Sequence, residues 1–257
     1  MWYRLISYLR FLIRSTNQHG VHSPFIYKLV TECFYDRQTY PEYDLLKTYN
    51  KKLHKNKRTI RVHDFGAGST VFRSDVRAVS KIARMAGISS KRQALLYRMI
   101  RFLDVSHSLE LGTSLGMATA AMSLGRKDGA VLSIEGCKNT AKVAKEQFQD
   151  FHLKNISVII NDFNVALDDL QDTQYDLIYI DGNHEKMATI EYFEKLLKYI
   201  HNETVMIFDD IHWSKDMNEA WGIISDHPRV TASIDTYYWG IAFFRKEQAK
   251  EHFVISL

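Results

Sequence analysis

From Ser89 onward, short apolar runs alternate with segments of helical periodicity, and this alternation restricts the fold more than any other feature. Ser89 or Ser90 can cap a first helix that carries Leu96 and Ile100 on one side. The expected strands are 108–111, 130–134, 156–160, 177–180, 205–208, 231–234 and 240–244, with helices between the first six. Such alternation predicts an α/β fold, with a doubly wound, Rossmann-like, seven-stranded and mostly parallel sheet.

The connection between the last two strands fixes their relative direction. Only Tyr237–Trp239 joins them, and a parallel crossover needs a dozen or more residues. The last strand is therefore expected to run antiparallel to its neighbours.

The first 87 residues differ from the rest, since they indicate helices and loops rich in tyrosine and basic residues. We expect residues 1–87 to form an N-terminal helical extension that acts as a lid, a substrate-selecting region or an oligomerisation region. Its apolar start, Met1–Ile13, is interrupted by arginines and is too short to cross a bilayer. A helix there can pack on its own domain or on a partner subunit, which would suit a homodimer, or it can lie on a membrane surface. No other stretch indicates a transmembrane segment.

Composition excludes several classes of protein. The 257 residues contain 46% hydrophobic and 25% charged residues, which is ordinary globular composition. A net charge of +4 is too small to indicate nucleic-acid binding by itself, although the basic run Lys51–Arg58 suits either a solvated helix end or a phosphate contact. Two cysteines, Cys33 and Cys137, form no disulfide framework, and a cytoplasmic location is the simplest inference.

Two glycine-containing turns compete for a nucleotide-type site, namely Asp64–Ser69 and Gly112–Gly116. In doubly wound folds an acid about 20 residues beyond such a turn holds the ribose hydroxyls. Glu135 lies 23 residues beyond Gly112 and ends a strand, whereas Arg84 and Met85 occupy the matching place after Asp64. The Gly112–Gly116 turn is therefore expected to bind the cofactor, and Asp64–Ser69 to be a structural turn or a flap.

The chosen turn lacks the G-x-G-x-x-G spacing that a pyrophosphate requires. It suits S-adenosylmethionine, which has adenine, ribose and a charged amino-acid tail but no phosphate. The amides at the turn can bind the carboxylate of the tail, and Glu135 can accept from both ribose hydroxyls. Asp162 and Phe163 follow the third strand, where an acid can bond the adenine amino group and an aromatic ring can cover the base.

Acids also follow the fourth and fifth strands. Asp181 ends the run Tyr179–Ile180–Asp181, and Asp209–Asp210 follow the next strand. Three acids at one edge repel one another unless a cation or a substrate amine lies between them. A hard divalent cation such as Mg²⁺ or Ca²⁺ is the natural partner, and His184 and His212 would also permit Mn²⁺ or Zn²⁺.

Residues 89–244 resemble the class I S-adenosylmethionine-dependent methyltransferases, and they are most similar to the metal-assisted O-methyltransferases of the catechol and caffeoyl-CoA type. The resemblance rests on Glu110–Gly116, Ser133–Glu135, Tyr179–Asp181 and Asp209–Asp210. It implies a methyltransferase domain over residues 88–257.

The resemblance also assigns roles to individual residues. It implies that the metal is held by Asp181, Asp209 and Asp210, although the family has Asn at the last position, and that His184 replaces the family's basic lysine. The catalytic residues would then be His184 and Asp181. The implied cofactor-binding residues are Glu110, Gly112, Thr113, Ser114, Gly116, Glu135, Gly136, Asp162, Phe163 and Asp181.

The sequence therefore predicts methylation of a small-molecule hydroxyl from S-adenosylmethionine, with Mg²⁺ or Mn²⁺ assistance. An RNA methyltransferase that uses the basic N-terminal region is a second possibility, which the small net charge does not favour. A nicotinamide-dependent oxidoreductase and a binding protein that keeps the fold without the chemistry also remain open.

Overall fold

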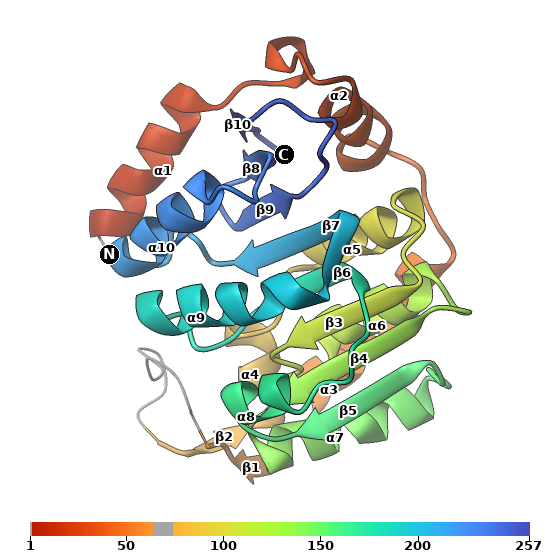
Figure 1. The fold of residues 1–257 in the computed structure, drawn as a ribbon. Coiled ribbons are helices and arrows are strands. Elements are labelled where there is room, and N and C mark those ends of the chain that lie inside the picture. The colour runs from red at the N-terminus through yellow and green to blue at the C-terminus, as the bar shows by residue number, and fades with distance from the viewer. Residues whose placement is uncertain (1, 64–73) are drawn as a thin grey trace. The chain divides into compact units, whose positions relative to one another are not determined.

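The computed structural model describes residues 2–63 and 74–257, which fold as two compact units (Figure 1). Residues 37–166 form one unit, called here the central unit. Residues 1–36 together with 167–257 form the other, called the split unit because it is discontinuous in sequence. Among the described residues, no helix has the length and apolar character needed to cross a membrane.

The central unit contains a parallel three-stranded arrangement with helices between the strands. Strands β3 (His107–Leu111), β4 (Ala130–Glu135) and β5 (Ile156–Ile160) pair in that order. The other elements of the unit are α3 (Glu42–Lys55), β1 (Thr59–Arg61), β2 (Val76–Ala78), α4 (Val79–Met85), α5 (Ser90–Phe102), α6 (Met117–Gly125), α7 (Lys138–Asp150) and the start of α8 (Phe163–Asp168). Leu111 pairs with Ile134, and Glu135 with Ile160, so the three carboxyl ends lie at one edge.

Helix α3 comes from the N-terminal region and packs within the central unit. Asn50 on α3 donates to Gln93 Oε1 on α5 at 2.7 Å, and Gln93 donates to the Met117 carbonyl at 2.7 Å. Tyr49, also on α3, donates from its hydroxyl to the Leu115 carbonyl at 2.8 Å. All of these side chains are buried, so α3 and α5 together fix the start of α6.

The split unit contains five strands and the two ends of the chain. Strands β6 (Tyr175–Ile180) and β7 (Ile200–Asp209) are parallel, β9 (Trp239–Phe243) is antiparallel to β7 and to β8 (Ala232–Asp235), and β10 (Glu251–Val254) is parallel to β8. The helices are α1 (Trp2–Arg14), α2 (Pro24–Leu29) with a π-helical turn over Val30–Phe34, α9 (Lys186–Leu196) and α10 (Lys215–Asp226). Short 3₁₀ turns cover Gln18–Gly20 and Leu197–Tyr199.

The predicted fold class is confirmed: this is an α/β fold with a mostly parallel, Rossmann-like arrangement of strands, an antiparallel last predicted strand and N-terminal helices. The predicted number of seven strands is wrong for the described residues, because β10 adds an eighth strand to β3–β9. The N-terminal region, expected to hold only helices and loops, also contains the antiparallel pair of β1 and β2. These three strands have only three or four residues each, too few to show a period of two.

The predicted N-terminal region is divided between the two units, because residues 1–36 fold with the split unit and residues 37–87 with the central unit. Its proposed role as a lid or a substrate-selecting region stays a prediction.

Candidate functional site

The turn after β3 contains three residues in the left-handed backbone region. Gly112, Ser114 and Gly116 have φ values of 105°, 47° and 74°. Gly116 is the N-cap residue of α6, and a Cβ atom there would lie 2.4 Å from Phe148 Cε1 and 2.7 Å from the Tyr49 hydroxyl. Only glycine fits this position without displacing its neighbours. The turn thus directs the amides at the start of α6 toward the edge of the strands.

Glu110, on β3 just before the turn, is a fully buried carboxylate in a hydroxyl network. Its Oε2 accepts from Thr119 Oγ1 at 2.5 Å and from the Ser133 hydroxyl, which also contacts the Thr113 hydroxyl. Its Oε1 is buried without a hydrogen-bond partner among the described residues. Burial raises the pKa of Glu110 to about 7, against the lowering effect of the two hydroxyls, and the Glu135 charge raises it further. One carboxylate oxygen is therefore available for a donor.

Glu135 ends β4 and is held by two backbone amides. Its Oε2 accepts from the Ser114 amide at 2.6 Å, and its Oε1 accepts from the Cys137 amide at 2.8 Å across the bend at Gly136. Each carboxylate oxygen can accept more than one hydrogen bond, so these contacts orient Glu135 and leave capacity for hydroxyl donors. The structure thus brings Glu135 to the predicted turn.

The end of β5 carries Asp162, which caps the following helix. Its Oδ1 accepts from the amides of Asn164 at 2.8 Å and Val165 at 3.4 Å. The cap engages one oxygen of the carboxylate. Asn164 Oδ1 is buried without a hydrogen-bond partner in the described part of the chain. Sequence reasoning missed Asn164, because an asparagine in the first turn of a helix is common and carries no signal of its own.

In the split unit, the loop after β6 holds the predicted catalytic pair. His184 Nε2 lies 3.6 Å from Asp181 Oδ1, and both side chains are about three-quarters buried. Asn183 and His184 adopt φ values of 67° and 47° in succession. Consecutive left-handed residues other than glycine are unfavourable, and such strain is concentrated at functional sites. The Asn183 amide nitrogen donates to the Tyr192 hydroxyl at 2.9 Å, which ties the loop to α9.

The acid that ends β7 and the acid that follows it are positioned differently from each other. Ile180 pairs with Phe208, so Asp181 and Asp209 follow paired positions on neighbouring strands. Asp209 is buried, and its Oδ2 accepts from the Tyr179 hydroxyl at 2.9 Å while its Oδ1 accepts from the Asp210 amide at 2.8 Å. Asp210 is in the left-handed region with φ 54°. Asp209 is thus hydrogen-bonded through both oxygens.

These acids do not make a metal site in the described part of the chain. Residues 2–63 and 74–257 contain no group of three or more His, Cys, Asp or Glu side chains arranged to hold a metal ion. The Asp209 carboxylate is engaged by Tyr179 and Asp210, and His212 Nε2 lies 2.8 Å from Asp235 Oδ2. The described residues therefore give no support to a site for Mg²⁺ or Mn²⁺, and the metal assistance expected from the sequence is not shown.

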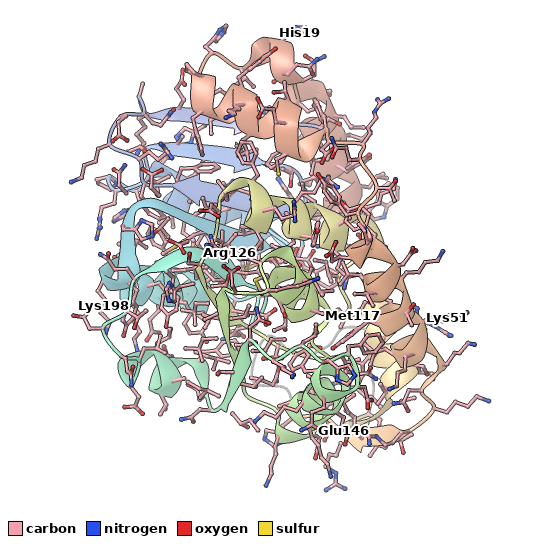
Figure 2. All side chains as sticks on the ribbon, turned by 90° about the vertical axis from the view of Figure 1, so that its right-hand side faces the viewer. His19, Lys51, Met117, Arg126, Glu146 and Lys198 are labelled. Atoms are coloured by element: carbon pink, nitrogen blue, oxygen red, sulfur yellow. The ribbon has the colours of Figure 1, made fainter. Side chains whose placement is uncertain are left out.

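Two other features from the sequence contribute little to a site. In the basic run, Lys52 lies 2.5 Å from Asp150 and Arg58 lies 2.7 Å from Glu146, both on α7, while the exposed Lys51 projects from α3 (Figure 2). Part of the expected phosphate-binding charge is thus already paired. The competing Asp64–Ser69 turn lies outside the described residues.

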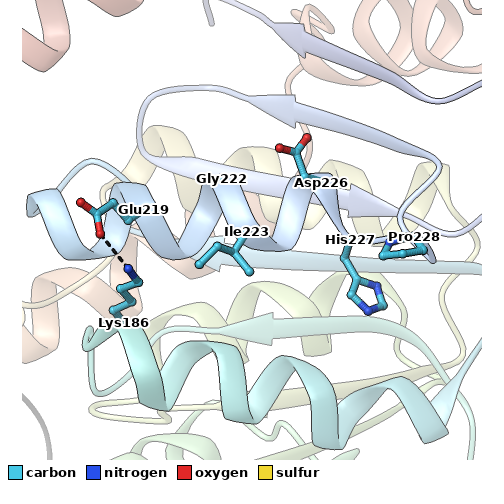
Figure 3. A pocket seen from close by; sticks show the side chains of 7 residues that line it. All are labelled: Lys186, Glu219, Gly222, Ile223, Asp226, His227 and Pro228. Carbon is cyan, nitrogen blue, oxygen red and sulfur yellow. Dashed lines mark hydrogen bonds and ion pairs between the residues drawn. The ribbon is translucent and has the colours of Figure 1, made fainter.

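A groove of about 600 Å³ lies between α9 and α10 (Figure 3). An ion pair of 2.7 Å between Lys186 and Glu219 spans one end of it, and His227 and Pro228 line the other. None of the predicted site residues lines it. The groove gives no support to a second catalytic centre.

Comparisons with known proteins agree with this arrangement. Residues 109–211, from the core of β3 to just past the acids after β7, match the family described as Methyltransferase domain. No match is found among the curated proteins. Three solved structures share the fold over most of their length.

The first is a methyltransferase from Podospora anserina with bound S-adenosylhomocysteine; it is 12% identical, with a TM-score of 0.63 over 88% of this chain and 98% of its own. The second is an O-methyltransferase of tomaymycin synthesis from Streptomyces achromogenes with S-adenosylmethionine, 14% identical, with a TM-score of 0.57 over 84% and 95%. The third, from Staphylococcus aureus, is assigned as a caffeoyl-CoA O-methyltransferase and is 17% identical, with a TM-score of 0.56 over 78% and 100%.

These structures establish the likeness of the fold, and the domain match identifies the enzyme class. The match over residues 109–211 identifies a methyltransferase domain, and the methyltransferase class predicted from the sequence is confirmed.

Proposed function

We propose that this protein transfers a methyl group from S-adenosylmethionine to a hydroxyl of a small molecule. One observation carries the proposal: the buried Glu110 has an unpartnered carboxylate oxygen, among the described residues, next to a left-handed turn in which position 116 admits only glycine. An unpaired buried carboxylate oxygen is costly unless a ligand donor reaches it. The ammonium of an amino-acid tail is such a donor, so the residues present fit this cofactor.

Different residues of the central unit would each bind a different part of the cofactor. Glu110 would accept from the ammonium group, and the amides from Gly112 to Gly116, with Thr113 and Ser114, would bind the carboxylate. Glu135, already oriented by two amides, would accept from the ribose hydroxyls, and Asp162 with Phe163 would hold the adenine. The cofactor supplies a methyl group on a positively charged sulfur.

The residues after β6 would act on the methyl acceptor. We assign His184 as the general base, which removes the hydroxyl proton as the oxygen–carbon bond forms and the carbon–sulfur bond breaks. Asp181 faces Nε2 of this imidazole at 3.6 Å, so it would stabilise the imidazolium and leave Nδ1 for the proton. The left-handed loop at Asn183 and His184 fixes the direction of the ring. No step of this mechanism passes through a metal ion.

The structurally similar O-methyltransferases support a hydroxyl as the acceptor. A reducing, cytoplasmic setting is proposed on Cys33 and Cys137, both of which are buried thiols.

Calorimetric titration with S-adenosylhomocysteine tests the cofactor site. We expect micromolar affinity, about −8 kcal/mol, and no binding of NAD. Tighter binding of NAD than of S-adenosylhomocysteine would contradict the proposal.

Transfer of labelled methyl from S-adenosylmethionine to phenols, catechols, aliphatic alcohols and RNA tests the acceptor. His184→Ala should lower turnover about 10²–10³-fold, and raised pH should partly restore it, because the acceptor then ionises alone. His201→Ala is the matched control, since His201 forms a similar pair with Asp176 at the opposite end of β6 and β7. If His184→Ala and His201→Ala lower turnover equally, His184 is not the general base. If RNA is the acceptor that is methylated and the small molecules are not, the acceptor is a nucleic acid.

A further inference from the structure

Helix α1 is covered by the split unit on one side and is apolar on the opposite side. One side packs on the split unit through the buried Ser7 and Phe11. At 100° per residue, a second set of large side chains falls on the opposite side of the helix. This exposed stripe consists of Trp2, Leu5, Ile6, Leu9, Leu12 and Ile13. Trp2 and Ile13, at its two ends, are 76% and 85% exposed.

The inner side of α1 is firmly attached, so the exposed stripe is held in a fixed direction. Ser7 Oγ lies 2.7 Å from His212 Nδ1, and the Tyr237 hydroxyl donates to the Arg4 carbonyl at 2.9 Å. The Tyr237 ring also contacts the rings of Tyr8 and Phe11, with centroids 4.9 and 5.6 Å away. Because these contacts use the inner side, the stripe has no role in holding α1 to the split unit. An apolar surface of this kind on a monomer marks an interaction site.

The charge of α1 identifies the kind of partner. The helix carries Arg4, Arg10 and Arg14 and no acidic residue. None of these arginines forms an ion pair within residues 2–63 and 74–257, and Arg4 lies over the Trp213 ring at 4.2 Å. At 100° per residue, Arg10 falls at the border of the stripe, whereas Arg4 and Arg14 fall nearer the inner side. An apolar stripe on a helix whose charged residues are all basic is complementary to a surface that is apolar inside and negatively charged at its rim. A phospholipid bilayer with anionic headgroups has this character.

Two other occupants fit less well. With 13 residues, α1 is about 20 Å long, less than the roughly 30 Å of a hydrocarbon core, so it would lie along a bilayer and not cross it. A second copy of α1, packed stripe against stripe, would place an Arg10 from each helix at the rim of the contact with no acid on either helix to pair it.

We propose that α1 docks this protein onto anionic phospholipid membranes, with the stripe inserted at the level of the headgroups, Arg10 at its border paired with a phosphate, and Arg14, at the exposed end of the helix, adding to the attraction between the helix and the anionic surface. This inference does not rest on the identity of the methyl acceptor. A tryptophan at the end of the stripe suits this depth, because its ring is apolar and its N–H is polar.

Sedimentation with vesicles tests the proposal. The 257-residue protein should bind vesicles of phosphatidylcholine with roughly 30% phosphatidylglycerol and should not bind phosphatidylcholine alone. Arg10→Gln with Arg14→Gln should weaken binding about 25-fold, about fivefold for each charge near an anionic surface. Lys142→Gln with Lys145→Gln removes the same charge from positions of α7 and should leave binding unchanged.

A second pair of variants tests the apolar part. Leu5→Ser with Leu9→Ser should weaken binding at least about 30-fold, whereas Met187→Ser with Ile223→Ser, at exposed apolar positions of α9 and α10, should not. Trp2 fluorescence, taken as the difference from Trp2→Phe, should shift to shorter wavelength on addition of anionic vesicles. Circular dichroism verifies that each variant is folded. Because Arg10→Gln with Arg14→Gln leaves the apolar stripe intact, this variant tests the charge alone.

Three results would overturn the proposal. The first is absence of binding to anionic vesicles, and the second is equal binding by the α1 variants. The third is a concentration-dependent dimer that Leu5→Ser with Leu9→Ser dissociates and that does not bind vesicles, since the stripe would then belong to a second copy.

Discussion

Replacement of Glu110 by glutamine should change the pH dependence of stability. The pKa of Glu110 is raised from its ordinary value of 4.5 to about 7, chiefly by burial. Between these two pH values the unfolded chain releases the proton while the folded chain keeps it, so stability falls as the pH rises. Above pH 7 both states are ionised and the loss is complete, at about 3 kcal/mol.

Glutamine resembles the protonated acid in shape and does not ionise. Its carbonyl oxygen can still accept from Thr119 and Ser133, while its amide nitrogen would lie where Oε1 has no partner among the described residues. That mismatch costs free energy independently of pH. The stability of Glu110→Gln relative to the wild type should therefore increase by about 2.5 kcal/mol between pH 5 and pH 8.

Urea unfolding at pH 5, 6, 7 and 8 measures this change, and carbon-13 NMR of the Glu110 carboxyl gives its pKa directly. Glu191→Gln, at an exposed position of α9, should show no comparable change. A difference between wild type and Glu110→Gln that is the same at pH 5 and pH 8 would refute the argument from burial.

The same group should couple cofactor binding to pH. If the ammonium of the cofactor requires ionised Glu110, the ionised fraction rises from about 0.1 at pH 6 to about 0.9 at pH 8, so the affinity for S-adenosylhomocysteine should rise about tenfold. Glu110→Gln should bind weakly and equally at both pH values. If the affinity of the wild type does not change with pH, Glu110 does not bind the ammonium group of the cofactor.

Three further outcomes are expected. Gly116→Ala should cost about 2–4 kcal/mol, from its left-handed φ and the contact with Phe148, whereas Gly222→Ala, with open space at its Cβ, should be neutral or stabilising in thermal unfolding. Glu135→Ala should weaken S-adenosylhomocysteine binding at least tenfold in calorimetry with the circular dichroism unchanged, and an unchanged affinity would reject its ribose role. Methyl transfer should persist after exhaustive EDTA treatment, because the Asp209 carboxylate is already hydrogen-bonded; a loss that Mg²⁺ reverses would restore the metal predicted from the sequence.

The ends of the parallel strands could be predicted because each has a strong local signal. Buried parallel strands are continuous apolar runs, and an acid or glycine directly after one stands out, as Glu135 and Asp181 do. The register of β3, β4 and β5 then brings the ends of these three strands to one edge without further information.

What could not be predicted depends on contacts between distant segments. The support of the α6 start by Tyr49 and Gln93 joins α3, α5 and α6, and no short motif records it. The short β10 depends on pairing with β8, which lies well before it in the chain. The hydrogen bond from Tyr179 to Asp209 could not be predicted either, because nothing in the sequence distinguishes this tyrosine from any other aromatic residue of the core.

The discontinuity of the split unit has a consequence for synthesis on the ribosome. The central unit is one uninterrupted stretch and can fold as soon as it has emerged, whereas α1 contacts Tyr237, which follows Arg4 by 233 residues. Since synthesis proceeds at about 5–20 residues per second, roughly 10–50 s pass between the synthesis of α1 and that of Tyr237. Over this time both the inner side of α1 and its apolar stripe are exposed. During that interval the nascent chain exposes Phe11 in addition to the apolar stripe, so a chaperone or a lipid surface that shields α1 should raise the yield of folded protein.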